Sequence, residues 1–286
     1  MPRESKISQL RRTINEVLEW DEKTVPPDVT VSTMTADAKL NVEFNITNIC
    51  KYMATSVGGI ARIKRGDESN FEFLNQVTVF VNTKHKKNGK PVSVKIFGNG
   101  RLHFTGVTNA DCVIDVTKTI CCELRKSICV ADDSNVVTKK SYIRSGMKHL
   151  KVENLHSFTI SMINCNTKAP FGINRKRLHS SLRKDGYKSA FDSNGHPAVK
   201  IRYVSTTKRE QKHKKRSVDD MGKNGNRVTI FVFESGSIII ILGNQGFSLA
   251  REAYDFMYRY LLTNYDTIVK DNDMINEIID NYETKS

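Results

Sequence analysis

The chain has 286 residues and a mass of 32.5 kDa, enough for one large domain or two small ones. Its 45 Lys and Arg residues outnumber its 31 Asp and Glu residues, which gives a net charge of +14 and a pI near 9.5. A folded basic protein of this kind most often meets a polyanion. The charged N-terminus and the lack of an apolar run of about 20 residues argue against secretion and against a membrane partner.

In the first half of the chain, helical and alternating patterns follow one another. They predict a helix at residues 5–20, a strand at 29–39, a helix at 41–54, two strands within 58–83, a basic loop at 84–90, a hairpin at 94–106 and a helix at 109–128. The hairpin "VKIFGNGRLHFTG" has a Phe at the end of its first strand and a tight turn that carries Gly.

The second half repeats this order. It predicts a strand at residues 156–165, a helix at 174–186, a hairpin at 187–204, a basic loop at 208–226, a hairpin at 228–243 and a helix at 247–265. Asn194-Gly195 is typical of a two-residue hairpin turn, and Gly186 is typical of a helix stop. A final amphipathic helix is expected from Ile275, Ile278, Ile279 and Tyr282.

The order strand, helix, four strands, helix thus occurs twice, which predicts an internal duplication. The simplest result is an antiparallel sheet with helices on one face. In "VTIFVFESGSIIIIL" both strand faces are apolar, since Ile230 and Val232 lie on one and Phe231 and Phe233 on the other. A strand face that only meets solvent is usually polar, so the second apolar face is expected to meet a partner.

No motif for catalysis, cofactor binding or metal ligation is found in the sequence, and we predict no enzyme activity and no cofactor. The cysteines lack C-x-x-C spacing, and neighbouring residues Cys121 and Cys122 point to different sides of a helix. We therefore expect buried thiols in a reducing compartment, without a disulfide framework or a zinc site. The six are Cys50, Cys112, Cys121, Cys122, Cys129 and Cys165.

Three stretches resemble the TATA-box-binding protein family. "VSTMTADAKLNVEFNITNI" is similar to the first strand and helix of the family's first repeat, and "VKIFGNGRLHFTG" to its fourth and fifth strands. "VTIFVFESGSIIIILGNQGFSLAREAYDFMYRYLL" is similar to the matching strands and long helix of the second repeat, and "CNTKAPFGINRKRL" is a weaker match. The divergence and the added segments are more like a factor of a large DNA virus than like a cellular protein.

The resemblance implies an α+β fold, with two tandem pseudo-symmetric repeats that form one curved antiparallel sheet, a saddle with helices on its convex face. The expected parts are an N-terminal helical extension at 1–25, repeat 1 at 26–130, a linker at 131–150, repeat 2 at 151–270 with a basic insertion at 206–226, and a helical tail at 271–286.

The resemblance also implies a function. Such a factor binds and bends A·T-rich double-stranded DNA through the minor groove and nucleates transcription with an RNA polymerase and a B-type initiation factor. The expected location is the nucleus or a viral factory in the host cytoplasm. No small-molecule substrate is implied.

The family's groove-wedging Phe residues map onto specific positions. Phe97 and Phe233 match the wedges at the ends of the fourth strands, with ordinary strand-end core residues as the alternative. For the other wedge of repeat 1, Phe71 and Phe73 remain open. In repeat 2 the aligned residue is His196, a poorer apolar wedge.

Other positions depart from the family. Its central Asn pair aligns with Val29 and Ile160, and Asn154 fills the second site only if the register shifts. Thr105 matches a base-contacting Thr, whose counterpart is Ile241. Further residues expected on the DNA-facing side are Val31, Ile239, Lys95 and His103, of which Lys95 and His103 replace apolar residues. Candidates for phosphate contacts, or else solvated charges, are Lys95, Arg101, Lys200 and Arg202.

The role of the basic loop and the function of the whole chain both have alternative interpretations. The basic loop is either a DNA-binding arm, a partner-binding insertion or a solvated loop. The lost Asn pair, His196 and Lys95 favour a protein-interaction module within a heteromeric transcription complex, with weak or no DNA binding of its own. A substrate-binding half of a nucleic-acid enzyme is the third alternative, but no catalytic set accompanies it.

Overall fold

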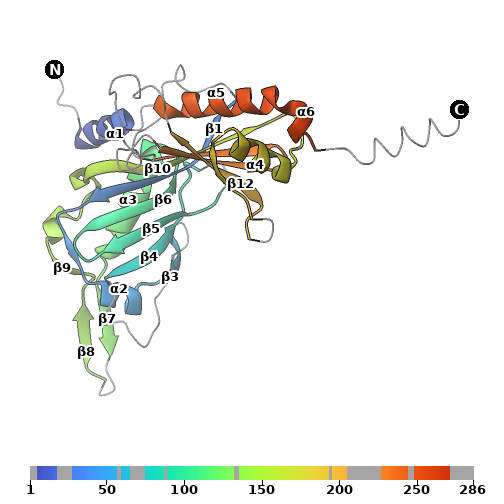
Figure 1. The fold of residues 1–286 in the computed structure, drawn as a ribbon. Coiled ribbons are helices and arrows are strands. Elements are labelled where there is room, and N and C mark those ends of the chain that lie inside the picture. The colour runs from blue at the N-terminus through green and yellow to red at the C-terminus, as the bar shows by residue number, and fades with distance from the viewer. Residues whose placement is uncertain are drawn as a thin grey trace, which may run out of the picture. The chain divides into compact units, whose positions relative to one another are not determined.

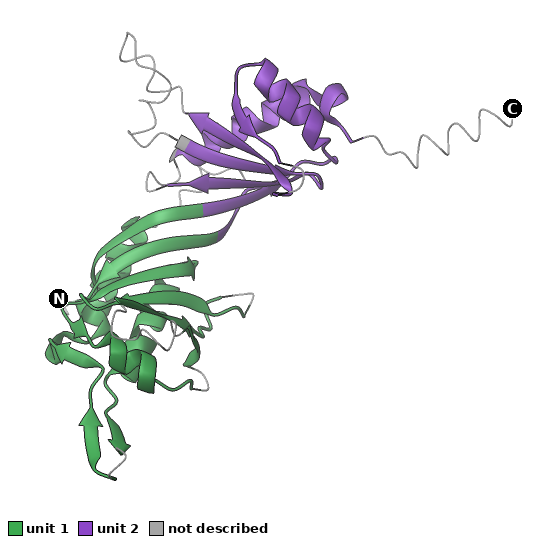
Figure 2. Ribbon diagram, turned by 60° about the horizontal axis from the view of Figure 1, so that its bottom comes forward, with its two compact units in different colours: residues 1–19, 33–163 green, residues 20–32, 164–286 purple. Residues whose placement is uncertain are grey.

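The computed structural model describes residues 5–17, 28–56, 59–64, 75–86, 89–131, 135–192, 195–204, 227–243 and 248–270. The chain divides into two compact units, coloured separately in Figure 2. Unit 1 comprises residues 1–19 and 33–163, and unit 2 comprises residues 20–32 and 164–286. The two boundaries fall inside strands β1 (Thr30–Lys39) and β10 (His156–Lys168), so each of these strands contributes to both units.

The remaining elements of unit 1 include one long helix that covers its strands. They are α1 (Lys6–Val17), β2 (Glu43–Phe44), α2 (Ile46–Tyr52), β3 (Ile60–Lys64), β4 (Gln76–Val81), β5 (Val92–Phe97), β6 (Arg101–Val107), α3 (Ala110–Leu124), β7 (Ile128–Ala131), β8 (Val137–Lys140), β9 (Ile143–Ser145) and the 3-10 turns η2 (Met147–His149) and η3 (Val152–Asn154). Figure 1 shows β1, β6, β5, β4 and β3 side by side.

Unit 2 repeats the order of the first. Its elements after β10 are α4 (Arg175–Lys184), β11 (Lys188–Ala190), β12 (Ala198–Val204), β13 (Arg227–Phe233), β14 (Ser237–Leu242), α5 (Ser248–Thr263) and α6 (Tyr265–Ile268). The large sheet has the hydrogen-bonded strand order β11-β12-β13-β14-β10-β1-β6-β5-β4-β3. The predicted α+β class and the duplicated antiparallel sheet are therefore confirmed.

The two β-turns that carry glycine are structurally equivalent. The N–H of Gly100 donates to the carbonyl of Phe97, and the N–H of Gly236 donates to that of Phe233, each over 3.1 Å. Both glycines have positive φ, 87° and 81°, and both turns dock against the strand that opens their unit. The Gly100 carbonyl accepts from the N–H of Leu40, and the Gly236 carbonyl accepts from that of Ala169. The duplication thus extends to individual backbone hydrogen bonds.

The helices that follow the opening strands begin in the same way. Asn45 Oδ1 accepts from the N–H of Asn48, and Asn174 Oδ1 accepts from the N–H of Arg177, each over 3.1 Å. Asparagine at the N-cap satisfies one of the free N–H groups of the first turn. These two caps confirm that 41–54 and 174–186 contain helices, but the first is shorter than predicted because residues 43–44 pair with β9.

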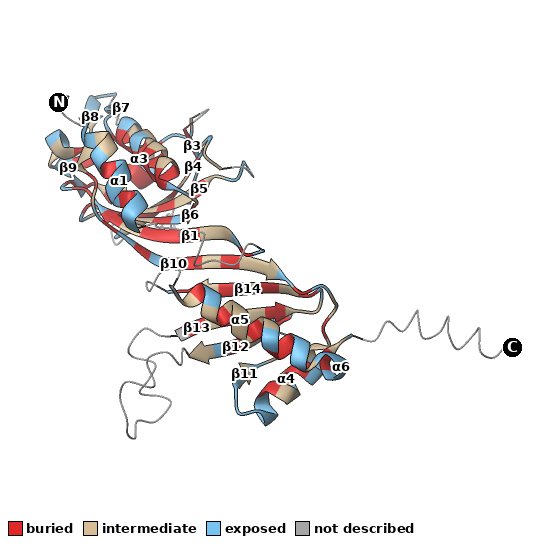
Figure 3. Cartoon of the chain, turned by 90° about the horizontal axis from the view of Figure 1, so that it is seen from above, coloured by how far each residue is buried: buried red, intermediate tan, exposed pale blue. Residues whose placement is uncertain are grey.

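Each unit buries one face of its strands against its helices. In unit 1, Val94, Ile96, Leu102 and Phe104 are completely buried, and α3 contacts β3, β4 and β6 on this side. In unit 2, α5 contacts β13 and β14, and α4 contacts β11 and β12, as Figure 3 shows from above. The buried residues there are Ile230, Val232, Ile238 and Ile240. Alternation along each strand leaves the other residues on the opposite face, which we call the open face.

One sequence prediction about a connection is wrong. A two-residue turn at Asn194-Gly195 requires Ser193 to pair with His196, but Lys188 pairs with Arg202 and Ala190 with Lys200, which is a different register. The described pairing of these two strands extends from Lys188 to Ala190. Residues 131–150, predicted as a linker, contain β8, β9 and η2. The C-terminal helix and the basic loop at 208–226 lie outside the described residues.

The prediction that all six thiols are buried is also wrong. Cys50, Cys112, Cys121 and Cys165 are buried, whereas Cys122 and Cys129 are exposed. Cys122 is an exposed residue of α3, and Cys129 is an exposed residue of β7 that pairs with Lys139 on β8. None of the described helices is long and apolar enough to cross a membrane.

Thiol labelling of the native protein is expected to modify two cysteines and spare four. Burial raises the pKa of the Cys121 and Cys165 thiols to about 12, so little thiolate is available at pH 8. Mass spectrometry after brief treatment with a maleimide checks this, with urea-unfolded protein as the control that labels all six. Labelling of Cys165 as fast as Cys122 would contradict the packing described here.

Candidate nucleic-acid interface

The open face of unit 1 is polar and basic, with two aromatic rings. Its side chains form cross-strand rows set by the strand register. From β3 to β1 the rows read Arg62, Phe80, Ser93, Thr105, Thr35; then Lys64, Thr78, Lys95, His103, Asp37; then Gln76, Phe97, Arg101, Lys39. The predicted positions Lys95, Phe97, Arg101, His103 and Thr105 therefore all lie on this one face.

The open face of unit 2 is more apolar. Its rows read Ala190, Lys200, Phe231, Ile239 and then Lys188, Arg202, Thr229, Ile241, and Phe233 lies opposite Ala198. When the equivalent turns at Gly100 and Gly236 are aligned, Lys95 corresponds to Phe231 and His103 corresponds to Ile239. Two polar residues of unit 1 thus replace two apolar residues of unit 2, which agrees with the departure noted in the sequence.

Phe97 and Phe233 are the last residues of β5 and β13, and both rings are half-buried. The guanidinium of Arg101 lies 5.4 Å from the centroid of the Phe97 ring. The His196 ring lies 6.4 Å from that of Phe233 and 5.2 Å from that of Phe231. Each strand-end Phe ring thus has a basic or imidazole side chain beside it on the open face and is not enclosed in the core.

Asp37 on β1 is hydrogen bonded to two predicted DNA-contacting residues. Arg101 Nε and Nη2 donate to Asp37 Oδ1 over 3.0 and 2.8 Å, and His103 Nδ1 lies 2.9 Å from the same oxygen. Partial burial raises the pKa of the Asp37 carboxyl, but the hydrogen bonds and charges of His103 and Arg101 outweigh this, so its pKa is lowered. The Arg101 guanidinium is therefore neutralised in part by Asp37, and the His103 ring is held beside the same carboxylate.

The Asp37 cluster is expected to add to stability above about pH 4 and to lose this contribution on acidification. The folded-state pKa lies below the unfolded value of about 3.9, so the contribution is complete above that value and disappears as the pH falls through the folded-state pKa. Asp37→Asn should cost roughly 1 kcal/mol at pH 6, after allowance for solvent screening, and less at pH 2.5, which lies below the unfolded-state pKa. Urea unfolding at both pH values checks this, and an equal cost at both would contradict it.

Three residues of the open face, Phe80, Phe231 and Asp37, were not among the DNA-contacting residues predicted from the sequence. Phe80 lies beneath the Arg62 guanidinium, 4.0 Å from its ring centroid. Phe231 lies between His196 and Lys200, whose Nζ is 5.9 Å from the ring centroid. The alternation in "QVTVFV" and "RVTIFVF" carries this signal, because Phe80 shares its side with Thr78 and Phe231 with Thr229. Asp37 had no comparable signal, because only the strand register brings it to Arg101 and His103.

Other predicted positions are placed differently or lie outside the described residues. Phe71, Phe73 and the loop 208–226 lie outside them. Leu40 contacts Gly100 in the same way as Ala169 contacts Gly236, so Leu40 and Ala169 are equivalent positions of the two repeats. Counting back along both strands from these residues makes Val31 the equivalent of Ile160. Val29 and Ile160 are therefore not a symmetry-related pair. Asn154 lies in η3, outside β10, and donates its Nδ2 to the carbonyl of His149. It therefore does not substitute for a strand residue.

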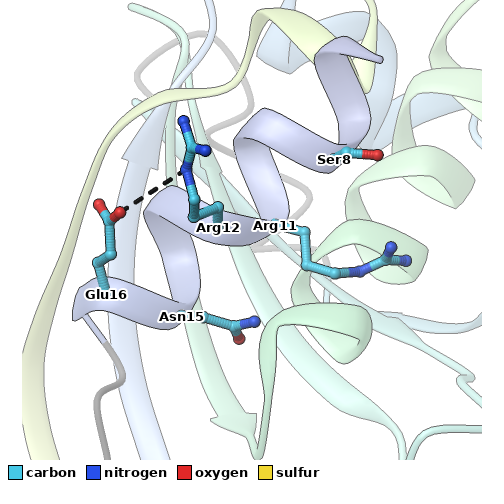
Figure 4. A pocket seen from close by; sticks show the side chains of 5 residues that line it. All are labelled: Ser8, Arg11, Arg12, Asn15 and Glu16. Carbon is cyan, nitrogen blue, oxygen red and sulfur yellow. Dashed lines mark ion pairs between the residues drawn. The ribbon is translucent and has the colours of Figure 1, made fainter. Parts of the chain in front are cut away.

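A shallow hollow on α1 is the other surface feature of note (Figure 4). Its volume is about 290 Å³, and Ser8, Arg11, Arg12, Asn15 and Glu16 line it. Arg12 pairs with Glu16 over 3.8 Å, and Arg11 pairs with Asp111 on α3 over 2.7 Å. Since both guanidinium groups already have carboxylate partners, the hollow offers no set of converging groups for a ligand.

Comparison with known proteins finds a similar protein from a virus. No family model matches the chain. A protein of Acanthamoeba polyphaga mimivirus described as "TATA-box-binding protein-like" is 23% identical over 284 residues, covering 84% of this chain and 67% of that protein. The solved structure of Methanococcus jannaschii TBP aligns with 80% of this chain and 96% of its own, at 12% identity and a TM-score of 0.47. The chain is thus similar over most of its length to a viral protein described as TATA-box-binding protein-like, in agreement with the resemblance noted in the sequence.

Proposed function

We propose that the chain is a transcription initiation factor that binds A·T-rich promoter DNA through the minor groove, bends it and helps to recruit an RNA polymerase with a B-type factor. The observation that carries the proposal is the open face of each unit. In both, a half-buried Phe stands at the end of the strand before the glycine turn, among basic residues and opposite the helices.

Electrostatics supports a polyanionic partner. The formal charge of the chain is +14, and the open-face rows contain Lys64, Lys95, Lys200 and Arg202. Lysine and arginine that neutralise phosphates release condensed counterions, so the binding constant falls steeply with salt. Charge alone does not bend the duplex. Phe97 and Phe233 are the proposed source of the bend, because apolar rings that enter base steps unstack and kink the duplex. Flexible TA steps make such kinks cheaper, which favours A·T-rich sites.

The test is a bending assay with the full chain. A duplex of about 20 base pairs with an A·T-rich centre carries a fluorescent donor and acceptor at its ends, and energy transfer is followed during titration at several salt concentrations. We expect tighter binding and higher transfer with the A·T-rich duplex than with a G·C-rich one. We also expect a linear fall of log K with log salt. Binding without any change in transfer would refute bending, and no binding at low salt would refute the function.

A second function, a saddle-fold module that docks another protein, is favoured by the polar positions Lys95, His103 and Asp37 on the unit 1 face. It predicts no DNA binding by the isolated chain at low salt, together with retention of polymerase subunits in a pull-down. The viral relative favours a viral factory or the nucleus as the place of action under either function.

A further inference from the structure

Asp37 places a negatively charged carboxylate on the face that is proposed to bind DNA, which is itself negatively charged. It is the only Asp or Glu in the ten strands of the large sheet. Its register partner is His103 on β6, so it faces the same side as Lys95 and Thr78 and belongs to the open face. A carboxylate there without a role would oppose DNA binding at the centre of the basic rows.

The carboxylate has one occupied oxygen and one available oxygen. Every hydrogen bond that the described side chains donate to Asp37 goes to Oδ1, from Arg101 and from His103. The side chain retains 18% of its exposure, so Oδ2 can accept a further hydrogen bond. The Arg101 guanidinium also offsets the negative charge, which limits repulsion of the phosphates.

The minor groove contains one kind of base-edge donor that could bind this oxygen. A·T pairs present only the acceptors adenine N3 and thymine O2, whereas a G·C pair adds the guanine N2 amino donor. A carboxylate oxygen accepts from that amino group but faces only acceptors at an A·T pair, where it would remain unsatisfied.

We propose that Asp37 reads a guanine N2 amino group, so the recognition sequence contains one G·C pair beneath unit 1 within its A·T-rich surroundings. This specificity rests on the proposed function, because it requires the open face to lie in the minor groove. The row next to Asp37 contains Phe97 and Arg101, so the amino group read by Asp37 lies close to the step that Phe97 enters.

The experiment scans one amino group through the binding site. Full-length protein is titrated with A·T-rich duplexes in which each pair in turn is A·T, inosine·C, G·C or 2,6-diaminopurine·T. The last two carry the minor-groove amino group and the first two lack it, so the comparison separates the amino group from all major-groove differences. At one position we expect both amino-bearing pairs to bind about 10-fold tighter, and at the other positions more weakly or equally.

Variants assign the preference to the residue. Asp37→Ala should abolish the preference at that position, and Asp37→Asn, which keeps the side-chain shape and can both donate and accept, should bind all four pairs about equally. Lys39→Ala, two residues along the same strand and on the same face, should weaken every duplex alike and keep the preference. Thermal unfolding of each variant confirms that it is folded.

The outcomes are distinct. Duplexes that are bound and bent, with amino-bearing pairs weaker at every position, would overturn the Asp37 proposal alone. A preference that persists in Asp37→Ala and Asp37→Asn would do the same. Failure of the wild-type chain to bind any of the duplexes at low salt would overturn the proposed function and this specificity with it.

Discussion

Replacing both Phe97 and Phe233 with alanine is expected to abolish most of the DNA bend and to weaken binding at least about 30-fold. Loss of base stacking on an aromatic ring costs about 1–3 kcal/mol per base, or about 2–6 kcal/mol for the pair, and 1.4 kcal/mol is tenfold in affinity. Both rings are half-buried at strand ends on the open face, so their removal leaves the helix-covered core in place. The end-to-end energy-transfer assay measures the bend and the affinity together.

Two control variants separate wedging from general contact. Phe97→Leu with Phe233→Leu keeps apolar wedges and should retain part of the bend. Ser93→Ala changes a half-buried polar residue of β5 on the same open face and should leave the bend unchanged. Equal bending by the wild type and by the double alanine variant would show that these rings do not enter the base steps.

Replacing Gly100 or Gly236 with alanine is expected to destabilise the fold by about 3–5 kcal/mol each. A non-glycine residue at positive φ costs about 1–2 kcal/mol, and these two positions have φ of 87° and 81°. In addition, a Cβ on Gly100 would lie 2.6 Å from the Val42 oxygen and still closer to that of Leu40, and one on Gly236 would lie 2.5 Å from the Phe171 oxygen. The turn would have to leave its strand, with loss of the hydrogen bonds that dock it. Urea unfolding followed by circular dichroism measures the cost.

Gly186 provides the matched control. Its φ is 80°, yet a Cβ there would meet nothing within 4 Å. Gly186→Ala therefore carries only the conformational cost, about 1–2 kcal/mol. If Gly100→Ala cost no more than Gly186→Ala, the close approach of the turn to residues 40–42 would be contradicted. Comparable losses at Gly100 and Gly236 are expected because the two turns are equivalent.

The pattern of elements was predictable because it depends on local sequence. The periods of the helices α3, α4 and α5 and the alternation of β5, β6, β13 and β14 were visible, and repetition of the same order identified the duplication. Turns were less predictable. The Asn194-Gly195 dipeptide favours a two-residue turn, but pairing of Lys188 with Arg202 places the strands in another register. A dipeptide sets a local preference, whereas register depends on which strand faces pack against the helices.

The candidate interface likewise combines features that follow from local sequence with features that depend on strand pairing. The basic charge, the two hairpins with Phe before a glycine turn, and the polar residues Lys95 and His103 were evident before the fold was known, because they follow from composition and local spacing. The hydrogen bonds of Asp37 with Arg101 and His103, residues more than 60 positions away in the chain, became visible only in the folded structure. The physical reason is that a carboxylate and its partners are brought together by the pairing of β1 with β6, a long-range contact that no local pattern records.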